Sequence, residues 1–284
     1  MMRLALLAGV ALMFALPAWC GDLRLLSPQV HNGEVAVLRW QGEPLSFGVV
    51  RFRDEVLYLY PDIGGAVILL PVGLETPAGD YPLRAALTDL QGRTTAKELV
   101  LRVDYKERPE EHLTLPERMV TPDVETVARI NREAKRLNEK FALRSPRFWT
   151  TFARPVSEPV NSVFGKRRVL NGKPKSPHSG TDFRSPSGTP VRSISNGQVT
   201  LVSDLFYTGQ TVVVDHGEGL FSLYAHLSKI LVEEGHDLRV GDILGEVGST
   251  GRSTGAHLHL TVRLLGERVD PLALIDVFEN HLDL

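Results

Sequence analysis

Short apolar runs alternate with turn-forming residues along the first third of the chain, from residue 23 to residue 105. The runs are rich in β-branched and aromatic side chains, and Gly, Pro, Asn and Asp separate them. They are 35-VAVLRW-40, 48-GVVRFR-53, 55-EVLYLY-60, 66-AVILL-70, 83-LRAALT-88 and 98-ELVLRVD-104. Short strands at this spacing are typical of a β-sandwich. No His, Cys or carboxylate cluster of ligand type falls among them, so we expect a non-catalytic, all-β domain over residues 21 to 105.

A charged stretch punctuated by prolines, 106-KERPEEHLTLPERM-119, follows and predicts a linker. After it, apolar residues recur at steps of three and four, which is the period of an amphipathic helix. This stripe consists of Val127, Ile130, Ala134, Leu137 and Phe141. Thr121 can cap the helix and Pro122 suits its first position. We therefore expect a helix over residues 121 to 141, within a connector of residues 106 to 145.

In 255-GAHLHLTVRLL-265, apolar and polar positions alternate with the period of a half-buried strand. Side chains at positions i and i+2 leave a strand on the same side, so His257 and His259 should face the same groove. Exposed histidines on such a strand are common. Two imidazoles on one open face, however, can share a ligand.

Upstream, 178-HSGTD-182 would place His178 and Asp182 on one face of an extended chain. Taken alone, this pair is typical of a surface histidine and a turn-forming aspartate. Combined with one histidine of the His257/His259 pair, it provides two nitrogens and one oxygen. That is the pattern of a catalytic zinc site, which keeps its fourth position open. The chain has one cysteine, Cys20, which excludes a thiolate-rich structural site.

Seven segments of the C-terminal half carry a resemblance to a known family. They are 164-FGKR-167, 178-HSGTD-182, 186-PSGTPV-191, 211-TVVVDHGEG-219, 224-YAHLS-228, 241-GDILGEVGSTGRSTGAHLHL-260 and 270-DP-271. In order and spacing this series resembles the lysostaphin-type zinc metalloendopeptidases, also called the LytM family, over about residues 155 to 275. The resemblance implies an antiparallel β catalytic domain, which we place at residues 146 to 284. The expected protein is mainly β, with an N-terminal β-sandwich-like domain and a helical connector.

By this resemblance, His178, Asp182 and His259 bind one zinc ion, and His226 and His257 are catalytic. Some relatives have lost ligands and only activate other cell-wall enzymes. All five positions are intact here, so the resemblance implies an active enzyme. The implied substrate is peptidoglycan, through its stem peptides, and the implied reaction is hydrolysis of peptide cross-links. We expect D-alanyl to meso-diaminopimelate bonds, because no wall-targeting module suited to a glycine bridge is evident.

The chemistry of these residue types agrees with the implied roles. Zinc held by three protein ligands lowers the pKa of a bound water to about 7 and polarises a scissile carbonyl. Peptide hydrolysis also needs a proton acceptor for the water and a donor to the leaving amine. His226 and His257 suit these tasks, because the unperturbed pKa of histidine is about 6.5. The sequence leaves open which of the two is the base, and it offers no HExxH helix with a glutamate base.

Five cationic residues crowd the loop that leads into His178. They are Lys166, Arg167, Arg168, Lys173 and Lys175. Peptidoglycan stem peptides carry carboxylates, and a cationic rim could hold and steer them. The competing interpretation is a flexible, solvated loop.

The first twenty residues predict a secretory signal peptide. Arg3 precedes an apolar run from Leu4 to Leu16, which is too short to span a bilayer. We therefore expect export across the inner membrane and a periplasmic location. A lipoprotein acylated at Cys20 is a second interpretation, which bulky Trp19 disfavours because such sites favour a small residue there.

Composition and length set the remaining limits. The chain has 284 residues and a formal net charge of −2, fits two modest domains, and shows nothing that indicates nucleic-acid binding. Three alternatives stay open beside the peptidoglycan enzyme: a binding module for wall peptides, an activator of cell-wall amidases, and a zinc protease that acts on proteins. The N-terminal domain could position substrate, bind cell-division or cell-wall regulatory proteins, or cover the groove.

Overall fold

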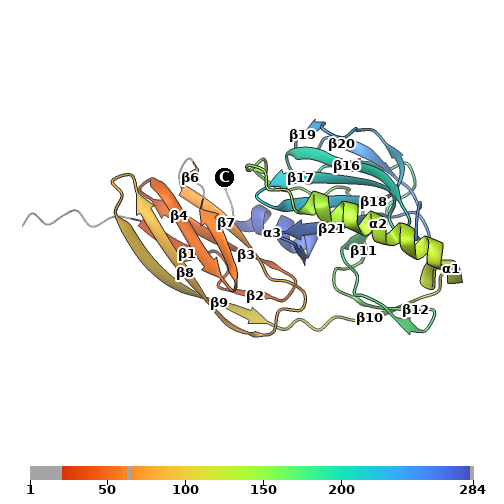
Figure 1. Cartoon of the computed structure of the whole chain (residues 1–284), viewed down its shortest axis with the longest axis horizontal. Helices are drawn as coiled ribbons and strands as arrows, with labels where there is room; N and C mark the ends of the chain where they lie inside the picture. Colours follow the sequence, from red (N-terminus) through yellow and green to blue (C-terminus); the bar gives the residue numbers. More distant parts are fainter. Residues whose placement is uncertain (1–20, 60, 63–64, 282–284) are drawn as a thin grey trace, which may run out of the picture.

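The computed structural model describes residues 21 to 59, 61 to 62 and 65 to 281. The predicted signal peptide, including Cys20, lies outside the described residues. Strands dominate the described chain and form two lobes, with one long helix along the second lobe (Figure 1). The prediction of a mainly β protein is confirmed. Among the helices that the structure describes, none has the length and apolarity needed to cross a membrane.

The N-terminal lobe is a sandwich of two sheets, with strand orders β1-β3-β7-β6 and β2-β9-β8-β4-β5. The first sheet contains β1 (Gly21–Leu25), β3 (Val35–Gly42), β6 (Pro61–Asp62) and β7 (Gly65–Pro71). The second contains β2 (Gln29–His31), β4 (Leu45–Phe52), β5 (Glu55–Leu59), β8 (Gly79–Asp89) and β9 (Thr94–Asp104). Leu38 and Trp40 of the first sheet share one apolar core with Phe52 and Leu87 of the second. Two sheets that bury their facing sides in this way form the predicted β-sandwich.

The first sheet of this sandwich is buried on both faces. Leu38 of β3 enters the sandwich core, whereas Val37 of β3 and Leu69 of β7 enter a second apolar cluster. That second cluster includes Phe278 of helix α3 (Pro271–His281), which belongs to the C-terminal lobe. Because side chains alternate across a strand, one sheet both closes the sandwich and anchors the other lobe.

The stretch predicted to be a linker is docked on the C-terminal lobe. Its strand β10 (Glu110–Leu113) pairs in parallel with β12 (Arg167–Leu170), and β12 also pairs with β13 (Lys173–Pro174). The single-turn helix α1 (Glu117–Val120) follows. Backbone hydrogen bonds to a strand far along the sequence therefore fix this charged segment in place.

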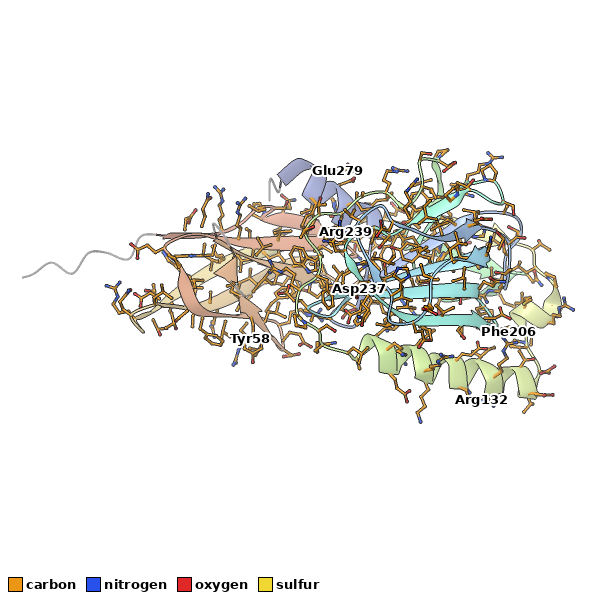
Figure 2. The ribbon with its side chains drawn as sticks, turned by 90° about the horizontal axis from the view of Figure 1, so that it is seen from above. Tyr58, Arg132, Phe206, Asp237, Arg239 and Glu279 are labelled. Atoms are coloured by element: carbon orange, nitrogen blue, oxygen red, sulfur yellow. The ribbon has the colours of Figure 1, made fainter. Side chains whose placement is uncertain are left out.

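The predicted amphipathic helix is α2 (Val124–Phe141). Asp123 caps it in place of Thr121, because its carboxylate accepts a hydrogen bond of 2.8 Å from the backbone N–H three residues on. The helix lies along the C-terminal sheet, where Phe141 packs edge-on against Phe221 with ring centroids 5.5 Å apart. Figure 2 shows α2 on one side of these strands and α3 on the other.

The C-terminal lobe is built on one large antiparallel sheet, with the main order β11-β14-β21-β18-β17-β16-β19. Its strands are β11 (Val160–Ser162), β14 (Thr181–Phe183), β15 (Pro190–Arg192), β16 (Gly197–Leu205), β17 (Gly209–Gly217), β18 (Leu220–Ile230), β19 (Asp237–Leu238), β20 (Ile243–Val247), β21 (Leu258–Leu264) and β22 (Glu267–Val269). One face of this sheet covers the large apolar cluster that the N-terminal lobe joins. The other face lies beneath α2 and carries the candidate site.

Candidate metal centre

Two neighbouring strands hold the aspartate and one of the predicted histidines. Asp182 on β14 lies directly opposite His259 on β21 in the antiparallel register. His178 reaches them from the loop before β14, which two backbone hydrogen bonds tie to the segment before β12. Gly180 permits this close approach, because a Cβ at that position would lie 2.1 Å from the carbonyl oxygen of Leu260.

Three ligand-type atoms converge at this point. Nε2 of His178 lies 3.0 Å from Oδ1 of Asp182 and 3.1 Å from Nδ1 of His259. The distance from Nδ1 of His259 to Oδ1 of Asp182 is 2.6 Å. All three side chains are buried, and together they form a group that could hold a metal ion.

Hydrogen-bond partners on the far sides of the two rings allow the inward-facing nitrogens to act as metal ligands. Nδ1 of His178 lies 2.9 Å from the carbonyl oxygen of Val163, which can only accept, so Nδ1 carries the proton. Nε2 of His259 lies 2.9 Å from Oγ1 of Thr261, a hydroxyl that can accept the ring proton and so free Nδ1 as an acceptor. Together with the Asp182 carboxylate, the two rings can therefore present three lone pairs to one cation, which replaces the protons that otherwise join these groups. A cation satisfies all three, and this donor set fits catalytic zinc.

The charge state of these groups suits metal binding. Burial acts to raise the pKa of Asp182, but its contacts with His178 and His259 outweigh burial and lower the pKa below its usual range. Burial lowers the pKa of His259. Nη2 of Arg168 lies 3.2 Å from Oδ2 of Asp182 and so holds the outer carboxylate oxygen. At neutral pH the carboxylate is ionised and the His259 imidazole is neutral, as ligands must be.

His226 enters the groove through a distortion of β18. Ala225 pairs with His259 and shares its face, so strict alternation would send His226 to the core side of the sheet. The backbone instead adopts a φ of +63° at His226, and the pairing of β18 with both β17 and β20 shifts register nearby. Such a bulge re-aims a side chain, and its strained backbone is typical of a functional position.

His226 and His257 lie side by side next to the three ligand-type side chains. Their ring centroids are 4.7 Å apart, and the His226 ring centroid is 5.9 Å from that of His259. In both rings Nδ1 donates to a backbone carbonyl, that of Thr250 at 2.8 Å and that of Gly255 at 2.9 Å. Each Nε2 is thereby left to exchange a proton with a substrate. Burial, then the neighbouring His259 and His257, lowers the pKa of His226 to about 3, so this ring is neutral at neutral pH.

The cationic loop before His178 is largely committed to the connector. Glu111 of β10 lies 3.2 Å from both Nζ of Lys166 and Nε of Arg168. Lys173 pairs with Glu117 of α1 at 2.7 Å. These cations thus form ion pairs with acidic side chains of the same chain. The predicted cationic rim lies where it was expected, but most of its positive charge is neutralised.

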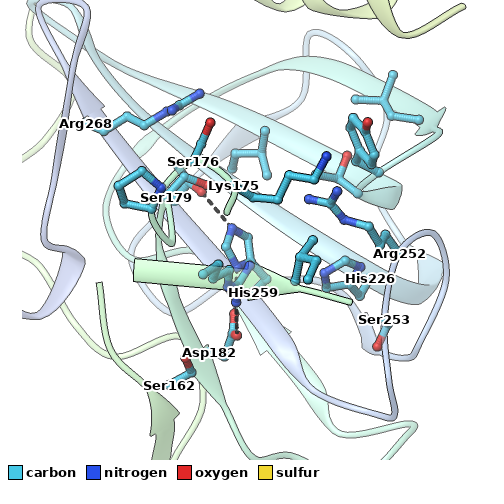
Figure 3. Close-up of a pocket in the computed structure, with 18 of the residues that line it drawn as sticks. Ser162, Lys175, Ser176, Ser179, Asp182, His226, Arg252, Ser253, His259 and Arg268 are labelled. Atoms are coloured by element: carbon cyan, nitrogen blue, oxygen red, sulfur yellow. Dashed lines mark hydrogen bonds and ion pairs between the residues drawn. The ribbon is translucent and has the colours of Figure 1, made fainter. Parts of the chain in front are cut away.

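The site opens into a groove of about 590 Å³. The outer face of β18 and β21 forms its floor, and α2 contributes a wall through Leu137 and Phe141. Figure 3 shows Asp182 directed at His259, with His226 beside them in the groove. All five predicted site residues except His178 line the groove directly, and His178 lies behind it with no exposed surface.

His216 is a buried residue outside the groove. Its Nδ1 lies 2.7 Å from the carbonyl oxygen of Asn196, and its Nε2 lies 2.7 Å from Oγ of Ser222. Complete burial lowers the pKa of His216 to about 4. It therefore stabilises the sheet in its neutral form and takes no part in the groove.

Hydrolysis at a metal ion requires both a set of converging acceptors and groups that exchange protons beside them, and this groove contains both. The fold and site thus define a metallohydrolase. The profile of peptidase family M23 matches residues 176 to 271, which include all five predicted site residues. A solved structure from Pseudomonas aeruginosa, assigned to the M23 peptidases, is 30% identical and covers 87% of this chain and 95% of its own, with a TM-score of 0.66. The chain belongs to peptidase family M23, which confirms the resemblance drawn from the motifs.

Two curated relatives match part of the chain. The DD-carboxypeptidase/endopeptidase Mpg of Neisseria meningitidis serogroup B is 43% identical over 97 residues, which are 34% of this chain and 22% of that protein. The peptidoglycan DD-endopeptidase ShyA of Vibrio cholerae is 40% identical over 114 residues, which are 40% of this chain and 26% of that protein. The chain therefore spans about a quarter of the length of these relatives.

Two supporting contacts were not predicted from the sequence. Thr261 holds the far side of His259, and its place two positions further along the same strand could have indicated this. Arg168 was interpreted only as part of a rim, although it binds Asp182. Its contact depends on the path of β12, which no local pattern indicates.

Loss of any one ligand should weaken zinc binding by more than about a hundredfold. Removal of a residue that only hydrogen-bonds to a ligand already lowers metal affinity by about 10- to 100-fold, and removal of the ligand itself should cost more. The variants are His178→Ala, Asp182→Asn and His259→Ala, and His226→Ala and His257→Ala are the matched controls. Isothermal titration of the metal-free proteins with zinc gives the affinities. Wild-type affinity in His259→Ala, or its loss in His257→Ala, would contradict the assignment.

The free energy of unfolding should fall as the pH falls from about 6.5 to about 4. The pKa of His216 is about 4 in the folded protein and about 6.5 in the unfolded chain, so the unfolded chain binds more protons in this window. His216 alone contributes roughly 3 kcal/mol of this loss. Urea unfolding at stepped pH should show a shallower dependence in His216→Gln than in wild type or in the control His236→Gln, which alters an exposed histidine. An unchanged dependence in His216→Gln would refute this role.

Proposed function

We propose that the chain is a zinc-dependent endopeptidase that hydrolyses peptide cross-links of peptidoglycan. The observation that carries this proposal is the convergence of three ligand-type side chains beside two imidazoles whose Nδ1 atoms are held by backbone carbonyls, which leaves Nε2 of each ring to exchange protons. A module that only binds the cell wall would not need His226 and His257 to exchange protons. A protein that only activates amidases would not need three intact metal ligands. Both kinds of residue are in place.

The names of the matching relatives support the choice of substrate. Mpg is named a DD-carboxypeptidase/endopeptidase and ShyA a peptidoglycan DD-endopeptidase. The family profile covers residues 176 to 271, which lie in the C-terminal lobe that carries the groove. We infer that the bond cleaved here joins D-alanine to meso-diaminopimelate in a neighbouring stem peptide.

Each side chain of the site has a separate role in the proposed hydrolysis. His178, Asp182 and His259 would hold zinc, which when bound polarises the scissile carbonyl and lowers the pKa of its water to about 7. His226 is neutral, so its Nε2 accepts a proton from the attacking water. His257 lies beside it with 15% of its side chain exposed; after its ring has taken up a second proton at Nε2, it can pass that proton to the leaving amine. Arg168 keeps the outer oxygen of Asp182 occupied, so that the inner oxygen stays directed at the centre.

We also propose that the chain is exported and acts in the periplasm. The support is the sequence of residues 1 to 20, in which Arg3 precedes an apolar run of signal-peptide length. Mass spectrometry of the protein from fractionated cells should find an unacylated mature chain, shortened by about twenty residues, in the periplasm. A full-length chain that stays in the cytoplasm would contradict export, and a lipid-modified Cys20 would contradict free release. Binding of cell-division or cell-wall regulatory proteins stays a prediction.

Zinc-loaded protein should convert purified cross-linked muropeptide dimers to monomers, and mass spectrometry of the products should identify the bond cleaved. Removal of one proton-transfer group costs about 10²- to 10⁴-fold in rate, so His257→Ala should be slower by that factor. His236→Ala removes an exposed histidine outside the groove and should match wild type. Intact dimers with wild type would refute the proposal, and cleavage of denatured protein at a similar rate would indicate a general protease instead.

A further inference from the structure

Two arginines face each other across the hairpin that follows the histidine strand. Arg263 of β21 and Arg268 of β22 are direct partners in the antiparallel register. The connecting residues, Leu265 and Gly266, have φ values of +52° and +90°, as in a two-residue type I′ turn. Such a short turn fixes the register, so the two arginines are held opposite one another by the backbone.

This arrangement is electrostatically unfavourable within the protein itself. Like charges directly opposite each other destabilise a sheet pair. Burial lowers the pKa of Arg268, and burial followed by the charge of Arg268 lowers the pKa of Arg263. Both guanidinium groups nevertheless stay charged, because arginine does not lose its proton in proteins. The hairpin therefore concentrates positive charge at this end of the groove.

No acid of the described residues forms an ion pair with Arg263 or Arg268, although the charge of Glu267 acts at longer range to raise the pKa of Arg263. Three acidic side chains line the groove, and each is already engaged: Asp182 with the histidines, Glu111 with Arg168 and Lys166, and Glu133 with Arg129. Glu267 is next to Arg268 in sequence, but it faces Gly73 of the N-terminal lobe. The partners seen for Arg263 are neutral, namely the ring of Phe141 at 4.6 Å and a long 3.5 Å contact with Asn138.

The pair continues the face that carries the candidate metal centre. His259, Thr261 and Arg263 alternate along β21, and all of them line the groove with Arg268. Four residues of extended strand separate His259 from Arg263, which is about 13 Å along the groove. Figure 3 shows Arg268 directed over the groove near Ser176, away from His226. Stacking of Arg263 on Phe141 uses the face of its guanidinium, so the N–H donors at its edge point elsewhere.

We propose that Arg263 and Arg268 form a carboxylate-binding subsite of the groove. Paired guanidinium groups match the planar, two-oxygen geometry of a carboxylate and gain from the exclusion of water. A carboxylate of the bound peptide, about 13 Å from the scissile bond, neutralises both arginines and relieves their repulsion. The subsite thus selects acidic peptides and sets their position along the strand. This inference rests on the proposed peptidase function.

The test compares a soluble cross-linked muropeptide dimer that has free carboxylates with the same dimer after amidation. Binding is measured by calorimetry on zinc-loaded protein in a His257→Ala background, which prevents turnover. The acidic dimer should bind about 10- to 100-fold more weakly when Arg268→Gln is added, since charged hydrogen bonds are among the strongest single contacts. The amidated dimer should bind equally with and without the change. Arg239→Gln, a matched change at an exposed arginine away from the groove, should bind both dimers like the parent protein.

Thermal unfolding separates binding from a structural role. Removal of one of two opposed cations should leave Tm unchanged or raise it, whereas an arginine needed for the fold would lower it. Equal weakening for the acidic and amidated dimers, or no weakening for either, would overturn the subsite.

Turnover by protein with His257 intact separates this inference from the proposed function. Equal hydrolysis of both dimers would refute the subsite and leave the peptidase activity standing. Selective binding of the acidic dimer without hydrolysis would refute the activity and support the subsite.

Discussion

The convergence of three proton acceptors is the constraint on which the C-terminal lobe depends. Asp182 and His259 are cross-strand partners, and the loop that carries His178 brings a third lone pair to the same point. Without a cation, hydrogen bonds from the two histidines and Arg168 must hold the buried carboxylate. Metal binding and folding of this region would therefore be coupled, because an ion held here would also stabilise the meeting of β14, β21 and the preceding loop.

Much of this site follows from local sequence patterns. The alternation around His257 and His259 places both rings on one face, and the structure has both in the groove. Spacing alone also indicated a β-sandwich before residue 105 and an amphipathic helix that ends at Phe141. These features are predictable because each depends on the period of a single element, which the order of apolar and polar residues records directly.

The remainder depends on relations between distant elements. His226 faces the groove because a bulge at one residue reverses the alternation of β18, and nothing in the sequence around it signals a positive φ. Residues 106 to 119 were expected to be a linker, yet they contain β10, which pairs with β12 more than fifty residues later. The pairing of Arg263 with Arg268 follows from a turn at Leu265, a residue type that rarely adopts such a conformation. Register and bulges are set by three-dimensional packing, so they could be found only in the structure.

The burial of β3 and β7 on both faces affects whether the C-terminal lobe of this protein can be separated from the N-terminal sandwich. Val37 and Leu69 share one apolar cluster with Trp149, Phe152 and Phe278. A C-terminal fragment cut free of the sandwich would expose that aromatic surface to water, and exposed patches of this kind promote aggregation. Although the family profile begins at residue 176, the apolar cluster that supports this lobe extends into the sheet that begins at residue 21. The peptidase lobe is therefore not a portable module, and transplanting it into another protein would require a new cover for the face that β3 and β7 now protect.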